Sequence, residues 1–168
     1  VTHRGWIGDA RWTSCFGPPS DQVARLMACG KESLRRGIDQ IKPSNRWIEF
    51  ARAVQTHVED ECKFHNIEGL GGHGYGRKLH APPFVANSIP SPLDKNSDAY
   101  KSCSPGTLVA VEPMIGAGTG KTRSLPNQWP VFTTDNSMSV HYEHDILVTD
   151  DGCRVLTHGL EDLIDIIQ

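Results

Sequence analysis

Two stretches in the first third of the chain carry apolar residues at helical spacing. The first has a predicted N-cap at Ser20 and a predicted end at Gly37, and its apolar positions are Val23, Leu26, Met27 and Leu34. The second begins at Pro43 and Ser44, and its apolar stripe consists of Trp47, Ala51, Val54 and Val58. We therefore expect two amphipathic helices, each with one buried face.

Short runs of β-forming residues before and after these helices predict strands. Residues 1–16 are rich in β-formers around Gly5 and Gly8, which predicts a hairpin arm and then a second strand that carries Asp9. Further strands are predicted at residues 108–112, 131–134, 138–143 and 146–149, with a hairpin turn at residues 150–152. Two helices followed by antiparallel strands favour an α+β fold, in a single domain that spans residues 1–168.

Two segments are expected to lack regular structure. Residues 69–76 hold so many glycines that we predict a loop whose backbone can approach another group closely. Residues 82–105 are rich in Pro, Ser, Asn and Asp and are expected to form a surface connection with little structure of its own. The glycine-rich segment is a candidate binding site.

Composition and charge exclude several classes of function. The 168 residues carry a formal net charge of −3 without a long basic run, so we expect no nucleic-acid partner and no membrane partner. The apolar runs are too short to span a bilayer and residues 1–4 do not resemble a signal peptide, so a cytoplasmic location is expected. The cysteines form no C-x-x-C pair, which favours reduced thiols over disulfides or a structural zinc site; they are Cys15, Cys29, Cys62, Cys103 and Cys153.

Some side chains of metal-ligand type stand where burial would be costly without a partner: Asp9, His73, Glu112 and Glu143. Glu112 ends an apolar strand, and a carboxylate there needs a counter-charge, a proton or a bound cation. Around Glu143, period-two alternation places His141 and Asp145 on the same face of the strand. Taken singly, each has an ordinary alternative: Asp9 caps a turn, His73 is a solvated histidine, and the glutamates pair with Arg or Lys.

Several motifs occur together in a fixed order. They are Gly-His-Gly-Tyr-Gly-Arg-Lys-Leu-His at residues 72–80, Val-Glu-Pro-Met at 111–114, Trp129, and Tyr-Glu-His at 142–144 followed by Leu-Val-Thr at 147–149. In this order and spacing the chain resembles the methionine aminopeptidases, from about residue 1 to residue 157. The connection from His80 to Glu112 leaves no room for the helical insertion of the type II enzymes, so type I is the closer match.

The resemblance implies a pita-bread (creatinase/aminopeptidase) fold, of which this chain would form the central and C-terminal part, with an antiparallel sheet and two flanking helices. It implies a centre of two divalent metal ions (Co, Mn, Fe or Zn), and a donor set rich in carboxylates suits such ions. In that centre Asp9 corresponds to the second aspartate ligand, His73 to the histidine ligand, Glu112 to the first glutamate and Glu143 to the bridging glutamate.

Other positions correspond to residues that contact substrate. His80 corresponds to the histidine that contacts the scissile amide without binding metal, which makes it the candidate catalytic residue. Trp129 corresponds to an aromatic wall of the methionine pocket, and Leu79 stands where the family usually has an aromatic residue. The chain also departs from the family at Ala81, where a glutamate is usual, at His141, where a glutamine is expected, and at Asp145, where a threonine is usual. His141 is expected either near the ligands or as a solvated histidine at the strand edge.

The implied activity is removal of the N-terminal methionine from nascent proteins and peptides, by a hydroxide held between the two ions. The implied partners are polypeptide N-termini, including those at the ribosome. The family's first aspartate would lie upstream of Val1, which implies an N-terminally incomplete domain that needs the missing segment and has little activity alone. Two alternatives stay open: a proline-specific peptidase of the prolidase or aminopeptidase P kind, and a pita-bread binding protein without catalysis.

Overall fold

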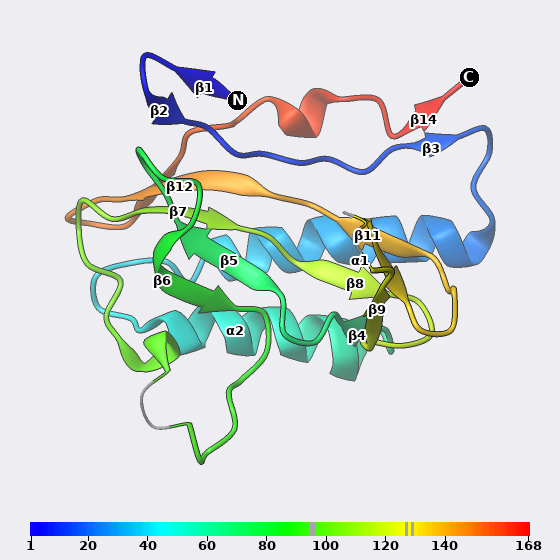
Figure 1. The fold of residues 1–168 in the computed structure, drawn as a ribbon, viewed down its shortest axis with the longest axis horizontal. Coiled ribbons are helices and arrows are strands. Elements are labelled where there is room, and N and C mark those ends of the chain that lie inside the picture. The colour runs from blue at the N-terminus through cyan, green and yellow to red at the C-terminus, as the bar shows by residue number, and fades with distance from the viewer. Residues whose placement is uncertain (95–96, 127, 129) are drawn as a thin grey trace.

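The computed structural model describes residues 1–94, 97–126, 128 and 130–168, and Figure 1 shows their course. A five-stranded antiparallel sheet lies at the centre, with the strand order β13-β12-β7-β5-β6. Its strands are β5 (Gly71–Gly74), β6 (Ala81–Ala86), β7 (Leu108–Val111), β12 (His144–Val148) and β13 (Cys153–Val155). A three-stranded sheet has the order β11-β8-β4 and consists of β4 (His65–Asn66), β8 (Met114–Gly116) and β11 (Ser139–His141).

The first predicted helix is confirmed as α1 (Asp21–Ile38). The hydroxyl of Ser20 accepts a hydrogen bond from the backbone N–H of Val23 at 3.4 Å, which is the predicted N-cap. The helix continues one residue past Gly37, the residue predicted to end it. Gly37 is needed for the packing of the helix and does not terminate it. A Cβ atom at Gly37 would come within 2.5 Å of the ring of Phe50, so the missing side chain lets the second helix approach closely.

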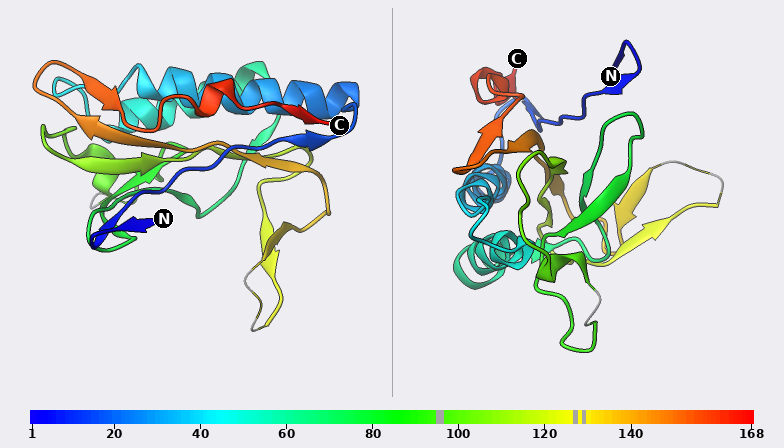
Figure 2. Two further views of the ribbon diagram at one scale, coloured as in Figure 1. Left: turned by 90° about the horizontal axis from the view of Figure 1, so that it is seen from above. Right: turned by 90° about the vertical axis from the view of Figure 1, so that its left-hand side faces the viewer.

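The second predicted helix is confirmed as α2 (Trp47–Gln55), which continues as the π-helix η1 (Thr56–Glu61). The predicted apolar stripe is fully buried, with exposed fractions between 0% and 1% for Trp47, Ala51, Val54 and Val58. Both helices lie on one side of the sheet, and β9 (Thr122–Ser124) and β10 (Val131–Thr133) project from the other side (Figure 2). The core therefore lies between the helices and one face of the sheet.

Two long extended segments of the chain run antiparallel to each other, and in each the strand is interrupted at one point. The first runs through β7 and β8 and is interrupted at Glu112 and Pro113, and the second runs through β11 and β12 and is interrupted at Tyr142 and Glu143. The interruptions lie side by side, because the N–H of Tyr142 donates to the carbonyl of Pro113 at 3.3 Å. The predicted strands at residues 108–112, 138–143 and 146–149 are confirmed, and both glutamates of interest stand at their breaks.

The prediction that residues 69–76 form a loop was wrong. Gly71–Gly74 is strand β5, which pairs with β6 on one side and β7 on the other. A Cβ atom at Gly72 would overlap the carbonyl oxygen of Ala110, and one at Gly74 would overlap that of Pro82. The glycines therefore serve the predicted close approach of backbone to backbone, but inside a sheet.

The prediction that residues 82–105 lack structure was also wrong in part. The start of that segment belongs to strand β6, and Asp98–Tyr100 forms the short 3-10 helix η2. The N–H of Phe84 donates to Asp98 at 2.8 Å, which ties η2 to β6. Proline is accommodated here because β6 is the edge strand of the sheet.

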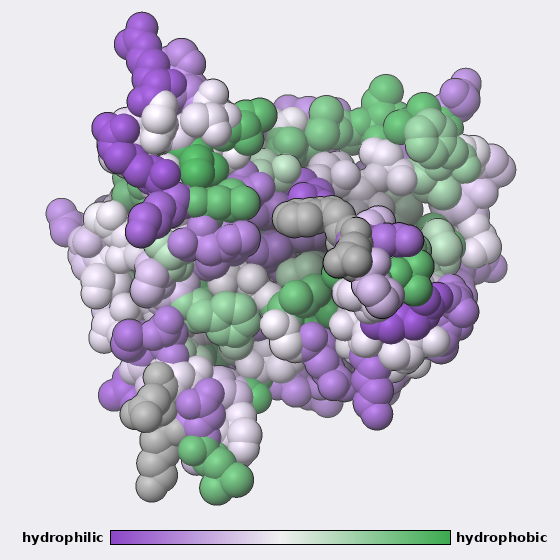
Figure 3. Space-filling view, in the orientation of Figure 1, coloured by the Kyte–Doolittle hydropathy of each residue, from purple (hydrophilic) through white to green (hydrophobic). Residues whose placement is uncertain are grey.

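The two ends of the chain run beside each other along the upper side of the molecule in Figure 1. The predicted hairpin is present as β1 (Thr2–His3) and β2 (Trp6–Ile7), but Asp9 lies beyond β2 and not within a second strand. Further on, β3 (Cys15–Phe16) pairs in parallel with β14 (Ile166–Ile167), after the 3-10 helix η3 (Leu160–Asp162). Phe16 is 83% exposed, and Figure 3 shows apolar surface at this end. Among the described residues, no helix combines the length and the apolar character that a bilayer crossing requires.

Candidate metal centre

The register of the central sheet places the predicted ligands on one face. His73 on β5 and Asp145 on β12 both pair with Ala110 on β7, so their side chains share the face of Ala110. Glu112 follows two residues after Ala110 and lies on that face as well. Val109 and Val111, which alternate with these residues, belong to the buried core. The polar side chains therefore gather on the face of the sheet that is turned away from the helices.

The predicted ligands converge there. His73 Nε2 lies 3.4 Å from Glu112 Oε1 and 3.8 Å from Asp9 Oδ2. Donor atoms of Asp9, His73 and Glu143 lie within 4.8 Å of one another. Donor atoms of Glu112, His141 and Glu143 satisfy the same limit, so Glu143 belongs to both groups.

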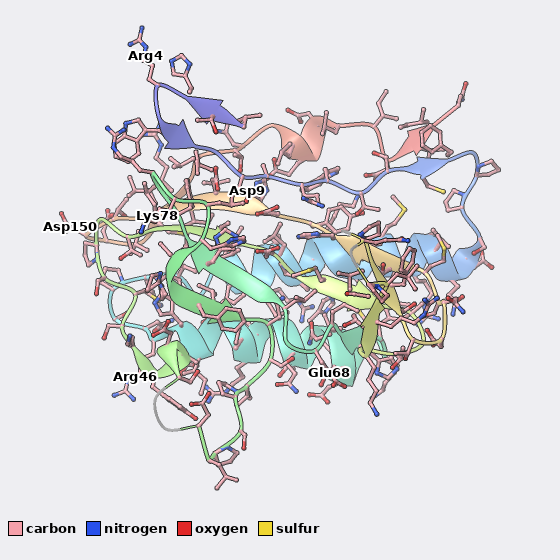
Figure 4. The ribbon with its side chains drawn as sticks, viewed as in Figure 1. Arg4, Asp9, Arg46, Glu68, Lys78 and Asp150 are labelled. Atoms are coloured by element: carbon pink, nitrogen blue, oxygen red, sulfur yellow. The ribbon has the colours of Figure 1, made fainter. Side chains whose placement is uncertain are left out.

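Backbone contacts hold Asp9 in place although it lies outside a strand. Its N–H donates to Asp145 Oδ2 at 3.0 Å. Two residues later, Arg11 and Glu143 exchange backbone hydrogen bonds of 2.8 and 3.4 Å. Figure 4 shows Asp9 beside β12, on the segment that follows β2. The sequence after Asp9 thus pairs with the same chain segment that presents Glu143.

Glu143 is the most strongly perturbed carboxyl of the centre. It is 2% exposed, and burial, together with the negative charges of Glu112 and Asp9, raises its pKa to about 8. Arg11 opposes this shift only weakly, because its Nε lies 4.0 Å from Glu143 Oε2 and its side chain is 62% exposed. A carboxyl in such surroundings needs a proton or a cation.

Asp145 contributes further negative charge behind the centre. Burial raises its pKa to about 6, although the hydrogen bond from the Asp9 N–H and the nearby Tyr75 hydroxyl partly counter the shift. Tyr75 is half-buried, and this burial raises the pKa of its hydroxyl well above the ordinary value. Alternation had placed Asp145 on the face of Glu143, but its hold on the Asp9 backbone could not be inferred from spacing.

His141 stands closer to the ligands than a solvated edge histidine would. Its Nε2 lies 2.9 Å from Glu112 Oε2 and 3.9 Å from Glu143 Oε2. This nitrogen is buried, yet within the described part of the chain it has no partner aligned for a hydrogen bond. The backbone of His141 is fixed by Thr13, whose hydroxyl accepts from its N–H and donates to its carbonyl. The nitrogen is therefore aimed into the space between the carboxylates.

The predicted substrate-contacting residues have different outcomes. His80 is exposed and packs edge-on against His73, with 4.4 Å between the ring centroids. It lines a pocket of about 570 Å³ together with His73 and Glu112. Leu79 is 41% exposed and does not line this pocket. Trp129 lies outside the described residues.

The donor set fits divalent metal ions. Three carboxylates and two imidazoles supply oxygen and nitrogen donors of the kind that Mn, Fe, Co and Zn accept in proteins. The buried Nε2 of His141 without an aligned partner and the raised pKa of Glu143 both indicate a centre that lacks balancing positive charge.

Known proteins match both the sequence and the fold. The family model of metallopeptidase family M24 matches residues 1–150. Methionine aminopeptidase 1 of Mycobacterium tuberculosis is 38% identical over 160 residues, which cover 92% of this chain and 58% of that protein. The crystal structure of methionine aminopeptidase from Thermotoga maritima superimposes with a TM-score of 0.83 at 30% identity, over 92% of this chain and 59% of that one.

A proline-specific enzyme shares the fold at lower identity. An Xaa-Pro dipeptidase from Bacillus anthracis matches with a TM-score of 0.67 at 24% identity, over 97% of this chain and 38% of that one. This likeness extends to the fold alone. The chain spans less than two thirds of the length of each of these relatives.

Proposed function

The chain belongs to metallopeptidase family M24, and we propose that it provides the metal centre of a methionine aminopeptidase. The family match and the superposition confirm the expected resemblance to methionine aminopeptidases and the α+β pita-bread fold. Because the chain spans 58% of the length of the relative from Mycobacterium tuberculosis, the activity of such relatives is carried over as a proposal. The observation that carries it is the convergence of Asp9, His73, Glu112 and Glu143 on one face of the sheet.

We assign two divalent ions to the two groups of donors. Asp9 and His73 would hold one ion, Glu112 and His141 the other, and Glu143 would contact both. When bound, such ions supply Lewis acidity toward the scissile carbonyl and lower the pKa of a coordinated water. The donor set supports Mn, Fe or Co, and also admits Zn.

His80 is assigned to the substrate and not to the metal. It belongs to neither group of donors, and it lines the pocket from the exposed side. From there its imidazole can donate a hydrogen bond to the substrate carbonyl oxygen as negative charge develops on it. The packing of His80 against the buried ring of His73 restricts its position, which favours this directed hydrogen bond.

The pocket beside the metal centre is lined so that it can bind an apolar substrate side chain next to the scissile bond. Leu70, Phe84 and Met114 line it along with His80 and Glu112. A flexible thioether side chain suits such an irregular apolar lining. We propose that the N-terminal residue of a nascent polypeptide, at the ribosome or after release, binds here. Leu79, which lies outside the pocket lining, and Trp129 are proposed as further substrate contacts on the resemblance to methionine aminopeptidases.

Peptide hydrolysis with added Mn(II) tests this function. In the whole protein of which this chain forms the metal centre, the tripeptide Met-Ala-Ser should be cleaved to methionine and Ala-Ser, whereas Ala-Pro and Ala-Pro-Ser should not be. Faster turnover of the proline peptides would favour the prolidase or aminopeptidase P alternative. Stoichiometric Mn(II) binding with no hydrolysis of any of these peptides would favour a binding protein without catalysis.

A further inference from the structure

A second cluster of ligand-type side chains lies among the helices, in a part of the molecule that the peptidase chemistry does not use. Cys29 on α1, His57 in η1 and Cys62 just after η1 each offer a donor atom, and the donor atoms lie within 4.8 Å of one another. Cys29 is 2% exposed and His57 is 7% exposed, whereas Cys62 is half-buried. The absence of a C-x-x-C pair had argued against a zinc site, so this cluster is created by folding and not by local spacing.

The π-helical turn brings two of these residues together. In an α-helix, residues five apart in the sequence point about 140° away from each other, since each residue turns the helix by about 100°. Here the N–H of Cys62 donates to the carbonyl of His57 at 2.9 Å, which is the wider π-type hydrogen bond. The wider turn places Cys62 Sγ 3.4 Å from His57 Nε2, facing Cys29 across the helix pair. Such turns are rare and frequently mark functional sites.

The imidazole of His57 is oriented as a metal-binding histidine usually is. Its Nδ1 lies 2.9 Å from Glu61 Oε2, so Nδ1–H donates to the carboxylate and Nε2 presents its lone pair to the thiols. Arg36 in turn pairs with Glu61, because its Nη1 donates to both carboxylate oxygens, at 2.7 and 2.8 Å. This chain of contacts fixes the tautomer and the direction of the ring.

We propose that Cys29, His57 and Cys62 form a binding site for Zn(II), separate from the carboxylate centre. Two thiolates and one imidazole form a soft donor set, which favours Zn(II) over metals that prefer oxygen ligands. The fourth position of a tetrahedral ion would face solvent beside the half-buried Cys62, where a water can complete the shell. The site would join α1 to the end of η1 and so stabilise the helical layer.

Cobalt titration tests the proposal, because Co(II) bound by thiolates absorbs in the near ultraviolet and Co(II) bound by carboxylates does not. The protein is reduced and freed of metal, titrated with Co(II), and then titrated with Zn(II). A thiolate-to-cobalt band should appear in the wild type and be removed by Zn(II). It should be lost in Cys62→Ser and retained in Cys15→Ser, a matched change of another half-buried thiol.

Two further variants keep the outcome decisive. Glu61→Gln, at a carboxylate that is 47% exposed, should weaken Zn(II) binding by about 10–100-fold while the fold is kept. His73→Ala removes a donor of the carboxylate centre and should leave the thiolate band unchanged, which separates this site from the proposed function. The proposal is overturned if the wild type shows no band at saturating Co(II), if Cys62→Ser retains it, or if a Cys29–Cys62 disulfide forms with Zn(II) present.

Discussion

Glu143 is the carboxyl that the metal-free protein accommodates least well, and Glu143→Gln makes this measurable. In the unfolded chain its pKa is close to the ordinary value of 4.5, whereas in the folded protein burial and the neighbouring charges of Glu112 and Asp9 raise it to about 8. Below about pH 4.5 the group is protonated in both states, and ionisation imposes no penalty on folding. As the pH rises through the folded pKa, the wild type loses stability relative to the variant.

The size of the effect follows from the shift. At 1.36 kcal/mol for each pKa unit, the difference between 4.5 and about 8 corresponds to a loss of up to about 5 kcal/mol above pH 8. The glutamine side chain of the variant carries no charge, so the variant should escape this loss. Metal-free Glu143→Gln should therefore be more stable than the wild type near pH 8.5, by several kcal/mol, and close to it near pH 5.

Urea unfolding followed by tryptophan fluorescence, with a chelator present, measures this difference at both pH values. Glu68→Gln is the matched control, because Glu68 is an exposed glutamate outside the centre (Figure 4), and its effect should be small at both. With Mn(II) present the order should reverse, since the variant loses the donor common to both groups of ligands. A stability difference between the wild type and Glu143→Gln that is the same at pH 5 and pH 8.5 would refute the electrostatic reasoning.

Other substitutions test separate parts of the account. In the intact enzyme, His80→Ala should lower kcat by about 10²–10⁴-fold and leave Mn(II) affinity unchanged in calorimetry, since the residue is assigned to the substrate; joint loss of metal and activity would make it a ligand. His141→Gln should weaken Mn(II) binding at one of two sites by at least about tenfold, and unchanged stoichiometry and affinity would exclude it as a donor. Gly72→Ala should destabilise the protein by about 1–3 kcal/mol in thermal unfolding, because its Cβ overlaps the Ala110 carbonyl oxygen, whereas Gly152→Ala, in open space, should have little effect.

The helices and most of the strands could be predicted because local patterns determined them. Ser20 is a residue type that often caps helix N-termini, and the apolar stripe that begins at Trp47 keeps helical spacing, so both helices could be predicted. Alternation around Glu143 correctly placed His141 and Asp145 on its face. Residues 108–112 showed a buried strand that ends in a carboxylate, and this pattern located Glu112.

The remaining features depend on contacts between distant segments. Strand β5 could not be recognised from propensity, because glycine is a poor strand former. Its glycines are needed because the backbones of β6 and β7 lie too close to leave room for side chains. The β-forming residues around Gly5 and Gly8 predicted a strand at Asp9, whereas its position is fixed by a hydrogen bond to the distant Asp145, which no local feature shows. The thiol cluster depends on a π-type turn after α2, and the sequence there continues the helical pattern without interruption.

The central claim is that Asp9, His73, Glu112 and Glu143 bind divalent metal together, and a crystal of the protein grown with Mn(II) tests it most directly. An anomalous difference map collected near the manganese absorption edge locates the metal independently of any assay. The account predicts two peaks with Glu143 in coordination distance of both, one also bound by His73 and the other by Glu112. Full Mn(II) loading with no peak among these four side chains would contradict it.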